Sequence, residues 1–481
     1  MASTADNPGD STEQIKHCHR VFQVQQQAFL DTAPPSAGDR QGHLERLKRA
    51  LLANRKELAS AINQDFSGRS TDETLIAEIM PAVQGINHAR SHLARWMKSS
   101  RRPVSMLFQP ARNHVQYQPK GVVGIIVPWN YPLYLAVGPL IAALAAGNRS
   151  MIKMSEFTPA TSALFRDIIA DIFPEDRVAV VTGDAKVAAD FAAKPFDHLL
   201  FTGSTSVGKL VMRAAAENLT PVTLELGGKS PALVSPDVPL TDAASRIAFG
   251  KAMNAGQTCV APDYVLCPTE KVADFVTELR KAFTRMYPKL RDNADYTAII
   301  NDRQYQRLQN YLEDARAKGA ELITLNPGNE NLSEGTRKLP LTLALNTTPE
   351  MTVMQDEIFG PILPIVGYQS LDQAIDYINR RPRPLALYFF GYDKHQQDDV
   401  LHRTHSGGAC INDTLMHVAQ DDLPFGGIGD SGMGHYHGKE GFLTFSHQRG
   451  VFARQKLNSG RFIHPPYGSL LHRLIYKLFI R

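Results

Sequence analysis

Cys259 is the residue whose surroundings most suggest chemistry. It follows Gly-Gln-Thr and precedes Val-Ala-Pro, so its neighbours are small or polar, whereas a structural thiol usually lies in an apolar run. A thiolate on a bend that faces a cleft is a strong nucleophile toward a carbonyl carbon. We therefore predict that Cys259 is a nucleophile and interpret Cys18, Cys267 and Cys410 as ordinary buried thiols.

Glu225 and Asn130 are two further residues suited to carbonyl chemistry. Glu225 lies between two leucines, just before a Gly-Gly turn. A carboxylate is costly to bury unless it is paired or protonated, so Glu225 is either a general base with a raised pKa or a salt-bridged structural residue. Asn130 lies in Pro128-Trp-Asn-Tyr-Pro132 at the end of a predicted strand. This segment is either a plain turn or a rigid turn that positions the side-chain amide of Asn130 to donate a hydrogen bond to an oxyanion.

Two glycine-rich segments are candidates for ligand contacts. Gly203-Ser-Thr-Ser-Val-Gly208 lies between a predicted strand and a predicted helix, where backbone N–H groups can approach a phosphate. It matches neither G-x-G-x-x-G nor a Walker loop, because Leu210 follows Lys209, so an ordinary tight turn fits at least as well. Residues 423–434 form the second segment, which we predict to lie over a ligand cleft, with Phe425 as its one aromatic residue.

Alternating strands and helices must position these residues. The first series has predicted strands at residues 121–127, 150–153, 178–181, 197–202 and 222–226, with helices between them, after a helical N-terminal part. Such alternation predicts a parallel, doubly wound α/β sheet that binds ligands beyond the carboxyl ends of its strands. A second α/β series with its own sheet begins at residue 231, so we predict a domain boundary near residues 228–230.

Composition excludes several classes of function. The chain has 481 residues, 52 of them basic and 48 acidic, and this near balance argues against a nucleic-acid-binding surface. Four unpatterned cysteines favour a reducing compartment, and the N-terminus lacks the features of a secretory signal. No apolar run is long enough to span a bilayer. His435, His437 and His447 have no carboxylate or thiol partners at ligand spacing, so we predict no metal site and a cytoplasmic location.

The C-terminal segment, residues 465–481, is amphipathic if it is helical. Leu471, Leu474, Ile475 and Leu478 then share one face. A role at a membrane surface is one interpretation. We favour packing of this segment against its own domain or a partner subunit.

Taken together and in this order, the motifs resemble those of the aldehyde dehydrogenase family. The matching pieces are Pro-Trp-Asn130-Tyr-Pro, Lys153-Met-Ser-Glu156, Gly203-Ser-Thr-Ser-Val-Gly208, Leu-Glu225-Leu-Gly-Gly-Lys, Gly-Gln-Thr-Cys259, Glu357-Ile-Phe-Gly-Pro and Pro-Phe425-Gly-Gly-Ile-Gly. The resemblance covers residues 21–467. Cys259-Val-Ala-Pro-Asp-Tyr264 is similar to the dimeric class-3 branch, and the segments that follow Asn130 and Lys153 are similar to bacterial coniferyl aldehyde dehydrogenases.

The resemblance implies a domain organisation and a homodimer. Residues 1–11 would be a disordered tail, and residues 12–230 a Rossmann-like NAD(P)-binding domain with bridging strands near residues 111–120. Residues 231–425 would form the catalytic domain, and residues 426–481 would return to the cofactor domain and supply a bridging strand and the C-terminal tail.

The resemblance also implies a mechanism. The thiolate of Cys259 would attack an aldehyde, while Asn130 and the backbone N–H of Cys259 stabilise the oxyanion. Hydride transfer to nicotinamide would leave a thioester, which water activated by Glu225 would hydrolyse to the carboxylic acid. Tyr131, Tyr134 and Phe425 would line an apolar approach suited to coniferyl, benzaldehyde-like or medium-chain aliphatic aldehydes.

Cofactor contacts follow from the same resemblance. Lys153 and Glu156 would bind the adenosine ribose, and Glu357 the nicotinamide ribose. Glu156 would repel a 2′-phosphate, so NAD is favoured and NADP stays an alternative, since Met154 stands where family members usually carry proline. The remaining contacts would be Gly203, Ser204 and Gly208 at the pyrophosphate and Phe359 near the nicotinamide.

Two other functions compete with this one. A CoA-acylating dehydrogenase would transfer the acyl group to CoA, but such enzymes typically lack a base at the position of Glu225. A non-catalytic binding protein on the same fold would have no reason to retain Cys259, Glu225 and Asn130 together.

Overall fold

A six-stranded sheet lies at the centre of the first half of the structure, a computed structural model that describes residues 8–332, 335–454, 456 and 463–480. Its strand order is β15-β7-β6-β3-β4-β5, and all neighbours are parallel except β15 and β7. The strands are β3 (Val122–Ile126), β4 (Arg149–Lys153), β5 (Val178–Val181), β6 (His198–Gly203), β7 (Val222–Leu226) and β15 (Gly432–Met433). The predicted doubly wound α/β sheet is confirmed.

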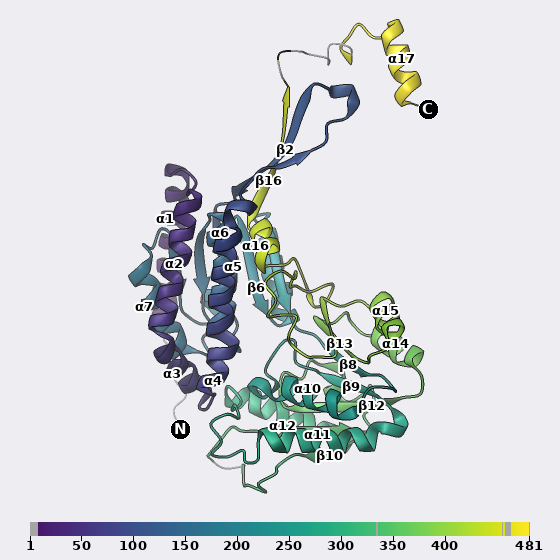
Figure 1. Cartoon of the computed structure of the whole chain (residues 1–481). Coiled ribbons are helices and arrows are strands. Elements are labelled where there is room, and N and C mark those ends of the chain that lie inside the picture. Colours follow the sequence, from purple (N-terminus) through teal and green to yellow (C-terminus); the bar gives the residue numbers. More distant parts are fainter. Residues whose placement is uncertain (1–7, 333–334, 455, 457–462, 481) are drawn as a thin grey trace.

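Helices cover both faces of this sheet (Figure 1), and the residues of its strands β3 and β4 are accordingly all buried. Along β3, Val123 and Ile125 pack into one core cluster, while Val122 and Ile126 pack into a second, as the two-residue repeat of a strand requires. The helices are α1 (Pro8–Asp31), α2 (Ala37–Ala53), α3 (Arg55–Phe66), α4 (Thr71–Thr74), the π-helical turn η1 (Leu75–Ile79), α5 (Met80–Trp96), α6 (Tyr134–Ala146), α7 (Pro159–Ile172), α8 (Ala185–Ala192) and α9 (Thr205–Ala216).

The N-terminal segment differs from the expectation. Helix α1 begins at Pro8, so residues 8–11 are helical rather than part of a disordered tail, and residues 1–7 lie outside the described residues. The hydroxyl of Ser11 donates a hydrogen bond to Asp184 at 3.0 Å, and Val21 and Phe22 are buried against the first sheet. These contacts hold the first turn of α1 in place. Its polar sequence has no apolar periodicity, so the helix was not predicted there.

A seven-stranded sheet forms the second half of the structure, in the order β10-β11-β12-β9-β8-β13-β14. Only β10 and β11 are antiparallel. The strands are β8 (Pro231–Val234), β9 (Tyr264–Pro268), β10 (Glu321–Thr324), β11 (Thr342–Leu345), β12 (Ile362–Tyr368), β13 (Ala386–Phe390) and β14 (Gly408–Ile411). The helices are α10 (Leu240–Ala252), α11 (Val272–Met286), α12 (Asp302–Ala317), α13 (Thr352–Gln355), α14 (Leu371–Asn379) and α15 (Lys394–Arg403).

A three-stranded antiparallel sheet projects from the body of the molecule (Figure 1). It consists of β1 (Ser100–Arg102), β2 (Ala111–Pro119) and β16 (Ser446–Arg454), and β16 pairs with β2 over its whole length. Helix α17 (Leu470–Phe479) lies beyond this arm. Among the helices of the described residues, none has both the length and the apolar composition that crossing a bilayer requires.

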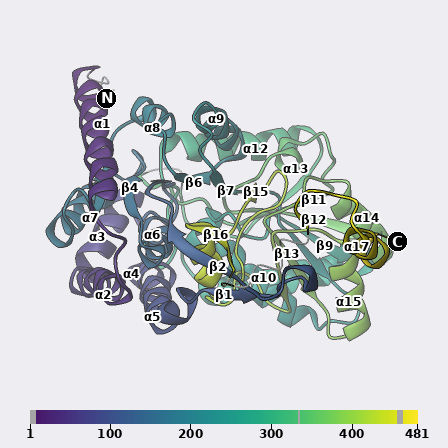
Figure 2. The same cartoon turned by 90° about the horizontal axis from the view of Figure 1, so that it is seen from above.

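The chain passes between the two large sheets twice. It leaves the first after Leu226 and enters the second at Pro231, and all seven strands of the second sheet are formed before it returns through residues 423–434 to β15. Helix α16 (Gly438–Thr444) then packs on α5 and α6. Figure 2, seen from above, shows α1–α5 on one side of the molecule and α14 and α15 on the other. The predicted domain limits stay predictions.

Candidate active site

Cys259 lies on a bend that follows the short 3-10 helix η3 (Met253–Gly256). Asn254 and Ala255 both have φ of 50°, which turns the chain sharply. The buried side chain of Gln257 holds the bend, because its Nε2 donates to the carbonyl oxygens of Asn254 at 3.0 Å and Ala298 at 3.1 Å. Cys259 is the one cysteine that is partly exposed, whereas the other three are buried free thiols. The predicted contrast between Cys259 and the other cysteines is thus present in the structure.

The electrostatics of Cys259 oppose ionisation of its thiol. Burial raises the pKa of Cys259 to about 12, and the negative charges of Glu357 and Glu225 raise it further. Burial also raises the pKa of Glu357 to about 8 and that of Glu225 well above its ordinary value. At neutral pH the carboxyl group of Glu357 is therefore mostly protonated, which removes most of its repulsion of a thiolate.

Glu225 lies on β7, next to Thr202 of β6 and opposite Gly432 of β15. Both carboxyl oxygens are buried and make no hydrogen bond to protein atoms, and no ion pair of Glu225 occurs within the described residues. Burial alone accounts for its raised pKa. Of the two interpretations from sequence, the salt-bridged structural glutamate is therefore wrong for this structure, and a buried carboxyl group with a high proton affinity is what remains.

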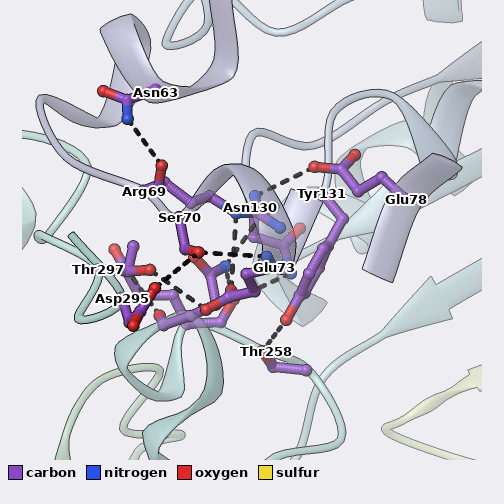
Figure 3. Close-up of polar contacts among 12 residues, drawn as sticks. Asn63, Arg69, Ser70, Glu73, Glu78, Asn130, Tyr131, Thr258, Asp295 and Thr297 are labelled. Carbon is purple, nitrogen blue, oxygen red and sulfur yellow. Dashed lines mark hydrogen bonds and ion pairs between the residues drawn. The ribbon is translucent and has the colours of Figure 1, made fainter. Parts of the chain in front are cut away.

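Asn130 lies in the turn that follows β3, and its side chain faces the Cys259 bend (Figure 3). Its Nδ2 donates to the carbonyl oxygen of Gln257 at 3.2 Å. The hydroxyl groups of Tyr131 and Thr258 are 2.9 Å apart, so a second bond joins the same turn and bend. The buried amide of Asn130 is therefore held beside the residues that precede Cys259, which a plain surface turn would not require.

Of the residues predicted to bind the cofactor, Lys153 and Gly203 lie at the carboxyl ends of β4 and β6. Lys153, the last residue of β4, is buried, and its Nζ donates to the carbonyl oxygens of Met154 at 2.6 Å and Gly183 at 2.7 Å. A lysine ammonium has three N–H groups, so one stays available to a ligand. Glu156 is exposed three residues further on. Gly203 ends β6 and Ser204 caps the N-terminus of α9, an arrangement suited to an anion.

Gly208 is inside helix α9 rather than in a loop, so the glycine-rich turn is shorter than predicted. It is buried against Leu226 of β7, and a Cβ atom at this position would lie 2.6 Å from the Leu226 side chain. The missing side chain therefore lets α9 pack closely on the sheet. Gly208 contributes to the position of the helix N-terminus, and only Ser204 lies between β6 and α9.

Glu357 and Phe359 lie on a segment that covers the Gly-Gly turn after β7. A Cβ atom on Gly227 would be 2.0 Å from Oε2 of Glu357, so this close approach requires glycine. The buried Oε1 of Glu357 makes no hydrogen bond, which leaves an acceptor for a ribose hydroxyl. Phe359 has φ of 49°, and its ring packs edge-on against Trp129 at 5.3 Å. These residues and the N-terminus of α9 fit a dinucleotide along the edge of the sheet.

The aromatic residues predicted to bind substrate separate into two groups. Tyr131 is buried beneath the guanidinium of Arg69, at 4.6 Å, and supports the bend. Tyr134 and Phe425 instead pack on the ring of His437, at 6.2 and 4.9 Å between centroids. A small cavity of about 30 Å³ borders Tyr134 and His437.

Sequence reasoning missed Tyr436 and His437. The Tyr436 hydroxyl and His437 Nε2 are buried without hydrogen-bond partners. Burial raises the pKa of Tyr436, and the charges of Tyr134, Glu225 and Cys259 raise it further. His437 was considered only as a metal ligand. In the described parts of the chain, no three or more His, Cys, Asp or Glu residues gather as a metal site. The sequence feature that could have identified these two residues is the His-Tyr-His sequence directly after the glycine-rich segment.

Comparison with known proteins gives a consistent result. The family model described as "Aldehyde dehydrogenase family" matches residues 8–451. A probable coniferyl aldehyde dehydrogenase of Pseudomonas aeruginosa is 59% identical over 472 residues, which cover 98% of each chain. The coniferyl aldehyde dehydrogenase of a Pseudomonas species is 48% identical over 473 residues, 98% of this chain and 96% of the other.

Two solved structures are similar over most of the chain. The substrate-bound state of Staphylococcus aureus AldH superposes with a TM-score of 0.91 at 37% identity, covering 96% of this chain and 99% of that one. The Mycobacterium tuberculosis aldehyde dehydrogenase complexed with NAD⁺ superposes with a TM-score of 0.83 at 28% identity, covering 92% of this chain and 91% of that one.

Proposed function

The chain belongs to the aldehyde dehydrogenase family, and we propose that it oxidises aromatic aldehydes of the coniferyl type to the corresponding carboxylic acids, with NAD as the oxidant. It is an oxidoreductase that acts on the aldehyde group. The observation that carries the proposal is the meeting of the Asn130 turn, the Cys259 bend and the buried carboxyl group of Glu225. The names of the relatives and the rings around His437 support an aromatic substrate.

The first step in this proposal is attack of the Cys259 thiolate on the aldehyde carbon. Negative charge then develops on the aldehyde oxygen, where Nδ2 of Asn130 and the backbone N–H of Cys259 donate hydrogen bonds. The bond from Nδ2 to the Gln257 carbonyl, 3.2 Å long, keeps the amide beside the bend before substrate arrives. Burial of Asn130 strengthens its interaction with the developing charge, because little water is present to compete.

A bound NAD would supply the hydride acceptor for this oxidation, which would leave a thioester on Cys259. Lys153 and Glu156 would bind the adenosine ribose, and the unpaired Oε1 of Glu357 would accept a hydrogen bond from the nicotinamide ribose. Gly203 and Ser204, at the N-terminus of α9, would bind the pyrophosphate. The carboxylate of Glu156 disfavours the 2′-phosphate of NADP by repulsion.

Glu225 completes the reaction by taking a proton from water, which hydrolyses the thioester. The high proton affinity of its buried carboxyl group suits it to this role once it is ionised. Water is thus the acyl acceptor, and no CoA is required. Free thiols at all four cysteines support a cytoplasmic location, and the projecting arm of β1, β2 and β16 supports a homodimer.

A panel of aldehydes tests the substrate. Coniferyl aldehyde, benzaldehyde and hexanal are compared by kcat/KM with NAD as the oxidant, and acid formation without CoA is measured by chromatography. We expect coniferyl aldehyde to have the highest kcat/KM. A preference for hexanal over both aromatic aldehydes would contradict the aromatic class while leaving the aldehyde chemistry in place.

A further inference from the structure

A buried ion cluster lies behind the turn that carries Asn130 (Figure 3). Arg69 is 0% exposed, and its Nη1 is 3.1 Å from Oε1 of Glu78, which is also fully buried. Its Nε is 3.6 Å from Oε1 of Glu73. Burying three charged side chains is costly even when they are paired, and apolar residues of the same size often give an equally stable core. The cluster therefore requires an explanation other than stability.

Arg69 and Glu78 both bind the backbone of the Asn130 turn. Nη1 of Arg69 donates to the carbonyl oxygen of Asn130 at 2.9 Å. Oε2 of Glu78 accepts hydrogen bonds from the backbone N–H groups of Leu133 and Tyr134, at 2.8 and 3.0 Å. The pair thus fixes the turn at Asn130 itself and again where helix α6 begins.

The same carbonyl oxygen also joins the turn to the Cys259 bend. Nδ2 of Asn254 donates to the Asn130 carbonyl oxygen at 3.1 Å and to that of Gln257 at 3.1 Å. Glu73 accepts a hydrogen bond from the backbone of Asn254. The ion cluster therefore contacts the oxyanion donor on one side and the nucleophile's bend on the other.

Local structure brings Glu78 to this place. Glu78 lies in the π-helical turn η1 between α4 and α5, where one extra residue widens the helix. Such turns are rare and occur frequently at functional sites. The guanidinium of Arg69 also lies between the rings of Phe66 and Tyr131, at 5.1 and 4.6 Å, which restricts its movement.

We propose that Arg69, paired with Glu78, is a positioning residue that holds the backbone of Asn130 so that its Nδ2 stays beside Cys259. The inference rests on the proposed catalytic role of Asn130. Arg69 touches neither substrate nor cofactor and acts through the Asn130 carbonyl oxygen.

The first test uses Arg69→Lys in the full chain. Lysine keeps the charge but cannot reach the Asn130 carbonyl and both carboxylates with one planar group. We expect kcat to fall at least tenfold, while the KM for NAD and the rate of Cys259 alkylation by iodoacetamide change less than twofold. No oxyanion forms during alkylation, so the alkylation rate measures the reactivity of the Cys259 thiol independently of the hydrogen bond from Asn130. A similar loss in alkylation would mean that the bend itself has moved and would overturn the proposal.

Arg149→Lys is the matched control. Arg149 is also a buried arginine that pairs with a carboxylate, Asp176, at 2.8 Å and donates to a backbone carbonyl, that of Ala28. It is at the start of β4, away from the Cys259 bend. We expect its kcat to stay within twofold of the wild type, and a tenfold loss here would show that any buried arginine has this effect.

Non-additivity is the decisive test. If Arg69 acts through Asn130, Arg69→Lys lowers kcat less than twofold in an Asn130→Ala background, whereas equal tenfold losses in both backgrounds overturn the inference and leave the proposed function intact. An Asn130→Ala variant with wild-type kcat would instead remove the oxyanion role on which both rest. The kcat of Glu78→Gln is also measured alone and in the Asn130→Ala background, and we again expect a smaller loss in that background. If Arg69→Lys does not fold, the Glu78→Gln result tests the proposal in its place.

Discussion

At the scale of single residues, the site combines a nucleophile and two acids whose pKa values burial moves in the same direction. The pKa of Cys259 is raised to about 12 and that of Glu357 to about 8, and the pKa of Glu225 is also raised. Burial therefore favours the neutral forms of these groups, whose reactive forms appear only when protons leave. This arrangement protects the thiol from oxidation, because the thiolate is the form that oxidants attack.

The pH dependence of thiol alkylation tests this state directly. Because the raised pKa of Cys259 keeps its thiol protonated, the thiolate fraction grows about tenfold per pH unit below that pKa. Near pH 8, ionisation of Glu357 adds a negative charge that opposes further ionisation of the thiol. We expect the alkylation rate without NAD to rise from pH 6, with a shallower slope above pH 8 and no plateau by pH 9. A plateau below pH 7 would mean that the thiol pKa is lowered.

The variant Glu225→Gln tests the general base. The amide cannot accept a proton from water, so we expect steady-state kcat to fall about 10²–10³-fold. Attack and hydride transfer do not need this proton transfer, so a burst of about one NADH per subunit should remain in rapid-mixing experiments. Glu217→Gln, at an exposed position after α9, is the control and should turn over within twofold of the wild type. Full steady-state turnover of Glu225→Gln without CoA would exclude Glu225 as the base.

At the scale of elements, strands were more predictable than the contacts that shape the site. The apolar runs at residues 122–126 and 178–181 identify buried strands, because both faces of a parallel sheet are covered by helices. Helices α14 and α15 were not predicted. In α14 the helical spacing of Ala374, Ile375 and Ile378 was missed, whereas the polar sequence of α15 buries only Val400 and gives a weak pattern. Gly208 was placed in a loop because glycine there has two explanations, a turn or close packing, and sequence does not separate them.

Gly208→Ala distinguishes these explanations. A Cβ atom at 2.6 Å from the buried Leu226 side chain must push α9 away from β7, and we expect overpacking of this kind to lower the free energy of unfolding by about 1–3 kcal/mol. The shift also moves the N-terminus of α9, so the KM for NAD should rise several-fold. Lys209→Ala, at the exposed neighbouring position, should change neither quantity. A variant as stable as the wild type would show that the Leu226 side chain moves aside without cost.

At the scale of the whole molecule, the site exists only where distant segments meet. Asn130 follows β3, Cys259 precedes β9 and Glu225 faces Gly432, a residue that comes late in the chain. The sequence motifs predicted all three residues as candidates, but they contain no information on which strand lies beside β7. Nor did they predict the cluster of Arg69, Glu73 and Glu78, because charged residues on an N-terminal helical stretch are usually solvated.

The projecting arm supports a prediction about assembly. In the sheet order β1-β2-β16, β16 is an edge strand, and exposed edges of this length invite pairing with another chain. The side chain of Phe452 on β16 is 51% exposed, and several apolar side chains of α17 are also exposed. We expect light scattering to give twice the chain mass of 53.2 kDa. Phe452→Asp should shift the protein toward the monomer, because a buried unpaired charge disfavours an interface.

Leu30→Asp is the matched control for this prediction. Leu30 is 77% exposed on α1, which packs on α8, β3, β4 and β5, so the same change of apolar side chain to charge should leave the dimer intact. Dissociation of both variants would mean that added negative charge, and not the arm, controls assembly. A wild-type chain that scatters as a monomer at micromolar concentration would exclude the arm as a dimer contact, and the edge of β16 would then need another element to cover it.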